Sequence, residues 1–138
     1  MMFRFDAKMG RYYGHDPKQR DMEMVITFLG GTGRLGQALV ARFSRAGFRT
    51  IVGSRAPSRG QTIASELNQR VNPVYCIESY DYAKAVEKAD IIFMTIPFPE
   101  SRDIALSLAH KLQYKILVDT SVPRSIYRHT EYPYDPRW

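Results

Sequence analysis

Residues 25–55 read VITFLGGTGRLGQALVARFSRAGFRTIVGSR, and this stretch decides the fold. It begins with an apolar run, passes through a glycine cluster into a segment with helical spacing, and ends in a second apolar run. That order predicts a strand at Met24 to Leu29, a tight turn, a helix at Leu35 to Ala46 and a strand at Phe48 to Gly53. Because the connection is short, the two strands should be parallel with a right-handed crossover.

The helix in this stretch is expected to bury one apolar face. Leu35, Leu39, Phe43 and Ala46 recur at steps of three and four residues, which is the spacing of a single helical face. Gly47 follows in the position where a residue with left-handed backbone conformation commonly ends a helix.

The remainder of the chain continues to alternate between strand and helix patterns. We expect strands at Val74–Ile77, Ile91–Ile96 and Lys115–Asp119, and helices at Gln61–Arg70, Tyr82–Ala89 and Glu100–Leu112, with Asp81 as an N-cap. This alternation predicts an α/β fold, a doubly wound parallel sheet of about five strands of the Rossmann type in a three-layer αβα arrangement. We expect a single domain over 24–123, with an irregular N-terminal extension over 1–23 and an irregular C-terminal tail over 124–138.

Composition and length limit the class of protein. The 138 residues suit one domain, and 44% hydrophobic with 25% charged residues is ordinary for a globular protein. The longest apolar run, Ile91 to Phe98, is shorter than the roughly 18 residues of a membrane span, and the N-terminus has no secretory h-region. We therefore expect a cytoplasmic protein without a membrane partner, in which the single cysteine, Cys76, is a small buried hydrophobe.

The net charge of +6 is concentrated in the glycine-containing unit. Residues 30–65 contain six arginines and no acidic residue, whereas the rest of the chain is balanced. Such a local field attracts polyanions, and nucleic acids are among them. The chain has no recognisable nucleic-acid-binding motif and no basic run, so we expect no nucleic-acid binding.

The glycine cluster fits the pattern G-x-G-x-x-G. The pattern comprises Gly31, Thr32, Gly33, Arg34, Leu35 and Gly36, with Gly30 preceding it. One glycine makes the tight turn, the next lets backbone amides approach a pyrophosphate, and the third lets helix and strand pack closely. Glycine-rich turns often only reverse the chain, but here the pattern follows a strand and opens a helix. That context favours a dinucleotide site, with the pyrophosphate at the helix N-terminus.

The end of the second strand indicates which dinucleotide binds. A site selective for NAD carries Asp or Glu roughly 20 residues after the glycines. This chain has Ser54 and Arg55 at that place, and its first acidic residue after the motif is Glu66. A hydroxyl and a guanidinium bind a 2′-phosphate that a carboxylate would repel, so NADP(H) is favoured, with Arg59 able to close over the same phosphate. The alternative is a set of solvated surface arginines, and this alternative stays open for Arg34 and Arg45.

Further candidate contacts follow the later strands. Ligands of open α/β sheets bind beyond the carboxyl ends of the strands, where Thr95, Ile96, Pro97 and Phe98 follow one strand and Asp119–Ser121 end another. Phe98 could equally pack in the core, and Asp119 could form a turn or cap. The three histidines lack metal-ligand spacing and a nucleophile, so no catalytic dyad and no metal site can be named. None is required for hydride chemistry, which a nicotinamide carries itself.

Three segments together show a family resemblance. FLGGTGRLGQALVARFSRAGFRTIVGSR, ADIIFMTIPF and KILVDTSVP resemble the NADPH-binding domain of the NADPH-dependent coenzyme F420 (deazaflavin) reductases, and the related oxidoreductase domain of the STEAP-type metalloreductases. The resemblance implies that Thr32, Arg34 and Leu35 line the pyrophosphate turn. It also implies that Ser54, Arg55 and Arg59 hold the 2′-phosphate, and that Ile96 to Phe98 flank the nicotinamide.

The activity implied by the resemblance is hydride transfer between NADPH and a flavin or deazaflavin, the small-molecule acceptor. Family reductases continue well beyond the fifth strand, whereas 17 residues follow Ser121 here. The alternative is therefore a non-catalytic NADP(H)-binding module, or a truncated domain that needs a partner chain to complete the acceptor site. A homodimer is the other arrangement that we considered.

Overall fold

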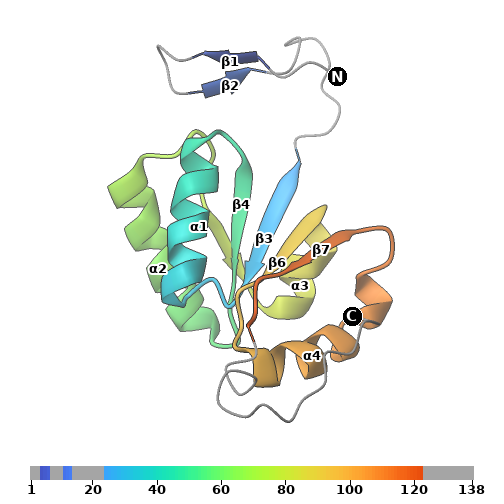
Figure 1. The fold of residues 1–138 in the computed structure, drawn as a ribbon. Helices are drawn as coiled ribbons and strands as arrows, with labels where there is room; N and C mark the ends of the chain where they lie inside the picture. Colours follow the sequence, from blue (N-terminus) through green and yellow to red (C-terminus); the bar gives the residue numbers. More distant parts are fainter. Residues whose placement is uncertain (1–3, 7–10, 14–23, 123–138) are drawn as a thin grey trace.

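Strands and helices alternate along the chain from Val25 onward in the computed structural model, which describes residues 4–6, 11–13 and 24–122 (Figure 1). The described strands of the main sheet are β3 (Val25–Leu29), β4 (Arg49–Gly53), β5 (Glu78–Tyr80), β6 (Ile91–Met94) and β7 (Ile116–Asp119). The described helices are α1 (Arg34–Arg45), α2 (Pro57–Val71), α3 (Tyr82–Lys88), α4 (Phe98–Ser107) and the 3-10 turn η1 (Ala109–Lys111). All neighbouring strands of this sheet are parallel, in the order β5-β4-β3-β6-β7. The predicted α/β fold with a doubly wound, five-stranded Rossmann-type sheet is confirmed.

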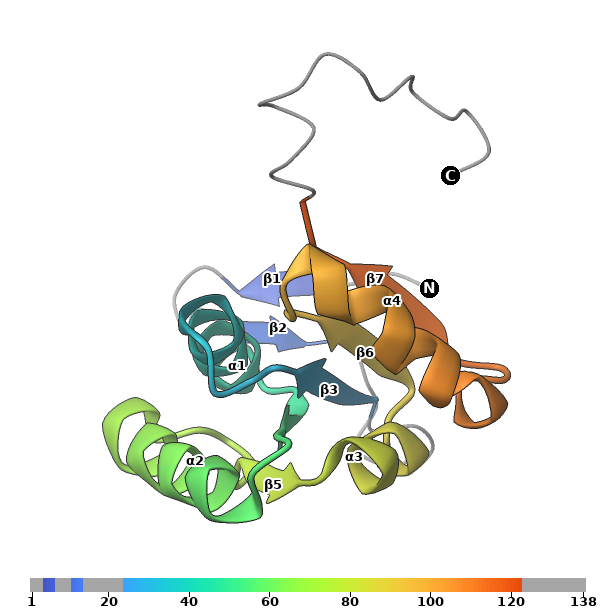
Figure 2. The ribbon, with the colours of Figure 1, turned by 90° about the horizontal axis from the view of Figure 1, so that it is seen from below.

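Helices cover both faces of the sheet (Figure 2). On one face, Val40 of α1 and Leu67 of α2 pack with Phe28 of β3 and Val52 of β4 in one buried cluster. On the other face, residues of α3 pack with Leu29, Ile92 and Met94 in a second cluster, against which α4 also packs. The strands between the two clusters are buried on both sides, as their near-continuous apolar sequences require.

The N-terminal region contains regular structure that the sequence did not indicate. Strand β1 (Arg4–Asp6) pairs antiparallel with β2 (Arg11–Tyr13). The prediction of an irregular extension over 1–23 was therefore wrong for these two segments, because strands of three residues are too short to show a period in the sequence. The predicted irregular tail over 124–138 lies outside the described residues.

Helix α1 buries the predicted face except at its start, since Leu39 and Phe43 pack against the cluster that contains Phe28. Its buried residues are Gly36, Val40 and Ser44, and Leu35 is 49% exposed. A Cβ atom at Gly36 would lie 2.6 Å from the carbonyl oxygen of Gly30 and from the Cα of Gly31, so the helix meets the preceding loop at this glycine. That close contact orients the helix and leaves Leu35 outside. The prediction for Gly47 is confirmed, since its φ is +94°.

Several boundaries differ from the sequence prediction. Helix α2 begins at Pro57 rather than Gln61, because proline is compatible with the first turn of a helix. Helix α4 begins at Phe98, directly after Pro97, and gives way to η1 before Leu112. Strand β6 ends at Met94, two residues before the predicted end at Ile96.

The third strand in chain order was predicted at Val74–Ile77, but the sheet pairing is made by Glu78–Tyr80. The backbone of Ile77 is instead held by a side chain of α2. The amide of Ile77 donates to Oδ1 of Asn68 at 2.8 Å, and Nδ2 of Asn68 donates to the Ile77 carbonyl at 2.9 Å. Asn68 thus provides the two hydrogen bonds that a neighbouring strand would otherwise provide to Ile77. Cys76, in the same segment, is exposed, so its predicted burial was also wrong.

Replacement of Asn68 by alanine should destabilise the fold by about 1–3 kcal/mol, because it leaves the amide and carbonyl of the buried Ile77 without this partner. Urea unfolding of the wild type and the variant measures the change. Gln69→Ala, an exposed position next along the same helix, is the control and should change stability by less than about 0.5 kcal/mol. Equal stability of the two variants would contradict this function of Asn68.

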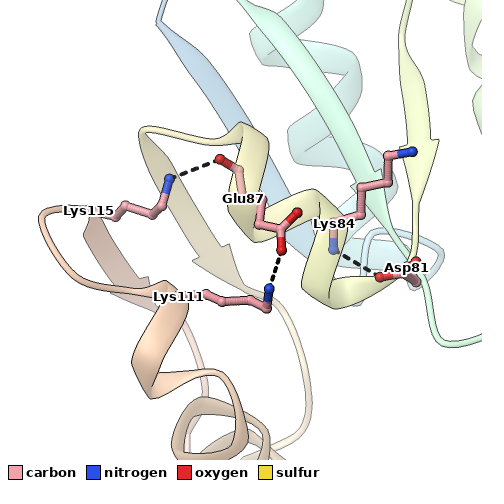
Figure 3. A network of polar contacts seen from close by, with 5 residues as sticks. All are labelled: Asp81, Lys84, Glu87, Lys111 and Lys115. Atoms are coloured by element: carbon pink, nitrogen blue, oxygen red, sulfur yellow. Dashed lines mark hydrogen bonds and ion pairs between the residues drawn. The ribbon is translucent and has the colours of Figure 1, made fainter.

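A polar network joins α3 to η1 and to Lys115, the residue before β7 (Figure 3). The side chain of Asp81 accepts a hydrogen bond from the Lys84 amide at 2.9 Å, which confirms the predicted N-cap. Lys111 of η1 forms an ion pair with Glu87 and donates a hydrogen bond to its carboxylate. The hydrogen bond and the positive charge of Lys111 lower the pKa of the Glu87 carboxyl. Nζ of Lys115 donates to the carbonyl oxygens of Glu87 at 3.2 Å and Ala89 at 2.5 Å. These contacts fix where the edge strand β7 begins.

Strand β7 is more exposed than the other long strands of the sheet. Ile116 is 58% exposed and Leu117 is 40% exposed, and Leu106 of the adjacent α4 is also exposed. The far edge of the sheet therefore presents apolar side chains to solvent. In the part of the chain that the structure describes, no helix has the length and apolar character to span a membrane.

Candidate cofactor-binding site

A cleft of about 240 Å³ lies beyond the carboxyl ends of β3, β4 and β6. Strand order reverses at this place, since β3 is followed by β4 on one side and has β6 on the other. Open α/β sheets bind ligands at such a switch point. The described residues that line the cleft are Gly30, Thr32, Gly33, Ser54, Arg55, Ala56, Arg59, Tyr82, Thr95, Ile96 and Pro97.

The glycine loop is packed too closely for larger residues at Gly30 and Gly31. Gly30 has a φ of +80°, and a Cβ atom there would lie 3.0 Å from the Thr95 carbonyl oxygen. A Cβ atom at Gly31 would lie 2.8 Å from the Phe28 carbonyl oxygen. Nε2 of Gln37 donates to the Thr32 carbonyl at 2.9 Å and so ties the loop to α1. The loop is held tightly between the sheet and the helix, with Thr32 and Gly33 at the cleft.

Two helix N-termini at the cleft have neither a side-chain cap nor an acidic residue in the first turn. Helix α1 begins after Gly33, and α2 begins after Ala56. By contrast, α3 is capped by Asp81. The first amides of a helix need an acceptor, and its positive end favours an anion. The ends of α1 and α2 therefore suit phosphate groups, and Gly33 and Ala56 beside them line the cleft.

The loop after β4 carries the predicted determinants of the 2′-phosphate. Ser54 is 3% exposed, and its hydroxyl donates to the Ala56 carbonyl at 2.9 Å and accepts from the Ala56 amide at 3.2 Å. Its hydroxyl thus shapes the turn that leads into α2. Arg55 and Arg59 are exposed, and both line the cleft.

Arg55 forms an ion pair that the sequence did not indicate. Its Nη1 lies 3.4 Å from Oε2 of Glu100, which is in the first turn of α4. The two side chains are 69% and 51% exposed. The pair links the loop after β4 to the helix after β6.

Tyr82, the first residue of α3, lines the cleft and is half-buried. Burial raises the pKa of its hydroxyl above the ordinary value. The Arg55 guanidinium and the Gly30 backbone lower this pKa and offset part of the effect, while the Glu100 carboxylate raises it. The hydroxyl therefore remains protonated at neutral pH and lies within reach of both the glycine loop and Arg55.

The end of β6 forms the other wall of the cleft. Thr95 donates from both its amide and its hydroxyl to the Leu29 carbonyl, at 2.8 Å and 2.7 Å, and so fixes this end of β6 against β3. Ile96 is buried and Pro97 is exposed, and both line the cleft. Phe98 is 45% exposed, so it does not pack in the core as the alternative interpretation had it.

The cleft brings together seven of the twelve predicted site residues, and they are Thr32, Gly33, Ser54, Arg55, Arg59, Ile96 and Pro97. Gly31 and Gly36 lie behind them and let the loop, the strand and α1 pack together. Arg34, Leu35 and Phe98 are exposed and are not among the residues that line the cleft.

Other predicted contacts have structural functions. Oδ1 of Asp119 accepts from the Ser121 amide at 2.8 Å, which is the turn that the alternative interpretation expected. The hydroxyl of Thr120 donates to the Met94 carbonyl at 2.7 Å. These residues connect β7 to β6 and do not line the cleft.

Sequence reasoning missed Tyr82, Ala56 and Glu100. Tyr82 follows the N-cap Asp81, so its place at the end of β5 could have suggested a residue near the ligand edge. Nothing in the sequence pairs Glu100 with Arg55. Among the described residues, no group of three or more His, Cys, Asp or Glu side chains could hold a metal ion.

Comparison with solved structures agrees with this fold. A structure from Arthrobacter sp. FB24, described as a candidate F420-dependent NADP-reductase, has a TM-score of 0.57 at 22% identity over 72% of this chain and 45% of that chain. A diketoreductase structure has a TM-score of 0.55 at 22% identity over 71% of this chain and 41% of that chain. Similarity at this level of identity concerns the fold alone.

Sequence comparisons extend the similarity to a family. Two F420-dependent NADP reductases, from Methanothermobacter thermautotrophicus and Methanothermobacter marburgensis, are each 30% identical over 103 residues. The aligned regions cover 74% and 72% of this chain, but 44% and 45% of those proteins, so the chain spans less than half of their length. A family model described as NADP oxidoreductase, coenzyme F420-dependent, matches residues 25–123. Because this match includes the whole parallel sheet and its helices, the chain belongs to the family of coenzyme F420-dependent NADP oxidoreductases.

Proposed function

We propose that this chain is an NADP(H)-binding oxidoreductase domain that transfers hydride between NADPH and a flavin or deazaflavin acceptor of the F420 type. The observation that supports it most is the convergence of three features on one cleft. These are a loop with no room for a side chain at Gly30 and Gly31, the N-termini of α1 and α2 without a cap or an acidic residue, and the pair Arg55 and Arg59.

The dinucleotide would bind with its pyrophosphate at the N-terminus of α1. Gly33 precedes this helix, and the amides of its first turn point toward the cleft end of the loop. The 2′-phosphate would lie at the start of α2, between Arg55 and Arg59, where two guanidinium groups and a helix N-terminus favour it. None of the described residues that line the cleft is acidic, so none of them offers a carboxylate for the ribose hydroxyls in the manner of an NAD site.

A bound nicotinamide supplies the hydride chemistry, and the residues of the chain orient the reactants. The side of the cleft formed by Ile96 and Pro97 is apolar and firmly anchored by the Thr95 hydrogen bonds. We propose that this wall flanks the nicotinamide and keeps water from one side of the ring. An acceptor would approach from the open side of the cleft.

The second candidate function is an NADP(H)-binding module whose acceptor site is completed by another chain. The observation that favours it is the exposed apolar surface of β7 and α4, which includes Leu106, Ile116 and Leu117. In the sheet, β7 is the neighbour of β6, and the proposed nicotinamide wall follows β6. A partner or a second copy that covers this surface would therefore lie on the β6 side of β3.

Titration of the purified chain with NADPH and NADH tests both candidates. We expect NADPH to bind at least about tenfold more tightly, since one charge-assisted contact to the 2′-phosphate contributes about 1.5–3 kcal/mol. Oxidation of NADPH is then followed with flavin and deazaflavin acceptors. Binding without oxidation would support the module, and absence of NADPH binding would refute both candidates.

A further inference from the structure

We propose that Glu100 is a specificity-determining residue, which competes with the 2′-phosphate of the dinucleotide for Arg55. The inference rests on the proposed function, because it assumes that NADP(H) binds in the cleft. In the structure, Arg55 is paired with the Glu100 carboxylate. Binding of NADPH would replace this carboxylate by the phosphate, whereas binding of NADH would leave the ion pair in place.

The ion pair lies across the cleft that we assign to the cofactor. Arg55 follows β4 and lines the cleft from the 2′-phosphate side. Pro97 lines the cleft from the other side, and α4 begins directly after it. Glu100 is in the first turn of this helix. The ion pair, with 3.4 Å between Nη1 of Arg55 and Oε2 of Glu100, therefore links the two walls of the cleft.

The ion pair lies close enough to Tyr82, which lines the cleft, to act on its hydroxyl. The charge of Arg55 lowers the pKa of the Tyr82 hydroxyl and that of Glu100 raises it, so both charges act on this one cleft residue. The Gly30 backbone acts on the same hydroxyl. The Arg55 guanidinium is thus close to Tyr82, and both residues line the cleft that the dinucleotide would occupy.

The pair is weak enough to be exchanged. Its side chains are 69% and 51% exposed, and exposed ion pairs of this kind are screened by solvent. A phosphate monoester carries more charge and more acceptor atoms than a carboxylate, and a guanidinium binds it in a bidentate manner. After exchange, Glu100 remains in the first turn of α4, where the positive end of the helix stabilises a carboxylate. Neither partner is left without a favourable environment.

The expected size of the effect follows from this weakness. Glu100→Gln removes the competing charge, and NADPH affinity should rise by about two- to fivefold, the range that corresponds to an exposed ion pair. NADH affinity should change by less than about 1.5-fold, since NADH has no group that takes the place of the carboxylate. The ratio of NADPH to NADH affinity should therefore increase, by about the same factor as NADPH affinity.

The control is Asp103→Asn, which removes the same charge from the next turn of α4. Asp103 is exposed and does not line the cleft. It should leave the affinities for both dinucleotides unchanged, within about 1.5-fold. An equal gain from Asp103→Asn would show that the effect of Glu100 is a general change in the field around the cleft, and would overturn the proposal.

The decisive experiment is a double-mutant cycle with Arg55→Gln. Affinities for NADPH and NADH are measured by fluorescence titration for the wild type, Glu100→Gln, Arg55→Gln and the double variant. If Glu100 acts through Arg55, Glu100→Gln has no effect on NADPH affinity in the Arg55→Gln background. A gain that persists in that background would refute competition for Arg55. Wild-type chain that binds no NADPH would refute the proposed function itself, whereas wild-type binding without a gain in Glu100→Gln refutes this inference alone.

Discussion

Arg55→Glu is expected to weaken NADPH binding by at least about 30-fold, which corresponds to about 2 kcal/mol or more, and to change NADH binding by no more than about threefold. The substitution removes the guanidinium that lines the cleft beside α2. It also puts a carboxylate opposite Glu100 and next to the 2′-phosphate, and like charges at close range add to the loss. Fluorescence titration with both dinucleotides measures the two affinities.

The matched control for this prediction is Arg45→Glu, which makes the same change of charge at the last turn of α1, away from the cleft lining. It should lower NADPH affinity by no more than about twofold, because an exposed charge at that distance is largely screened by salt. Comparable losses for NADPH and NADH in Arg55→Glu would contradict the assignment of Arg55 to the 2′-phosphate. A loss of NADPH affinity greater than twofold in Arg45→Glu would indicate an effect of the general positive charge of residues 30–65. A smaller loss would indicate that Arg55 acts through a local contact.

Gly36→Ala is expected to destabilise the fold by about 1–3 kcal/mol and to abolish most dinucleotide binding. The added Cβ would lie 2.6 Å from the Gly30 carbonyl oxygen and from the Gly31 Cα, and these are backbone atoms that no side-chain rotation can move away. Helix α1 or the glycine loop has to shift, and the shift displaces Thr32 and Gly33 from the cleft. Urea unfolding and NADPH titration measure the two effects.

Gly33→Ala is the comparison for this substitution. Gly33 has a φ of −79° and a ψ of 168°, which alanine adopts readily, and its Cβ would approach the Gly30 carbonyl oxygen only to 3.3 Å. Its cost in stability should be clearly smaller than that of Gly36→Ala. If the two variants unfold at the same urea concentration with the same dependence on urea, the close packing at Gly36 does not determine the position of α1.

Local sequence signals were sufficient for the order and type of most elements. The apolar runs before Gly30 and before Ser54 are long enough to mark buried strands, and the glycine pattern between them identifies the loop. Asp81 and Gly47 were recognised as helix boundaries because each acts through its own backbone neighbourhood. Signals of this kind depend on residues that are close in the sequence, so they do not depend on how the rest of the chain packs.

The predictions were wrong where a contact with another element of the structure outweighed the local sequence pattern. The run from Val74 to Ile77 has strand-like residues, but Asn68 binds the backbone of Ile77 and leaves the pairing with β4 to Glu78–Tyr80. At the start of α1, Leu35 is exposed although it was predicted to face inward, because Gly36 contacts the loop at Gly30 instead. In both cases, the competing contact comes from another element, and its strength cannot be read from periodicity.

The sequence by itself determined the parallel α/β fold, the glycine loop and the basic loop after β4, because each is encoded by neighbouring residues. Only the tertiary structure decided which residues share the cleft. The strand order β5-β4-β3-β6-β7 places the ends of β4 and β6 on either side of β3, and so brings Glu100 to Arg55 at the cleft that Tyr82 also lines. The physical reason is that strand order and helix packing are settled by burial of the two apolar faces of the sheet, a property of the whole domain.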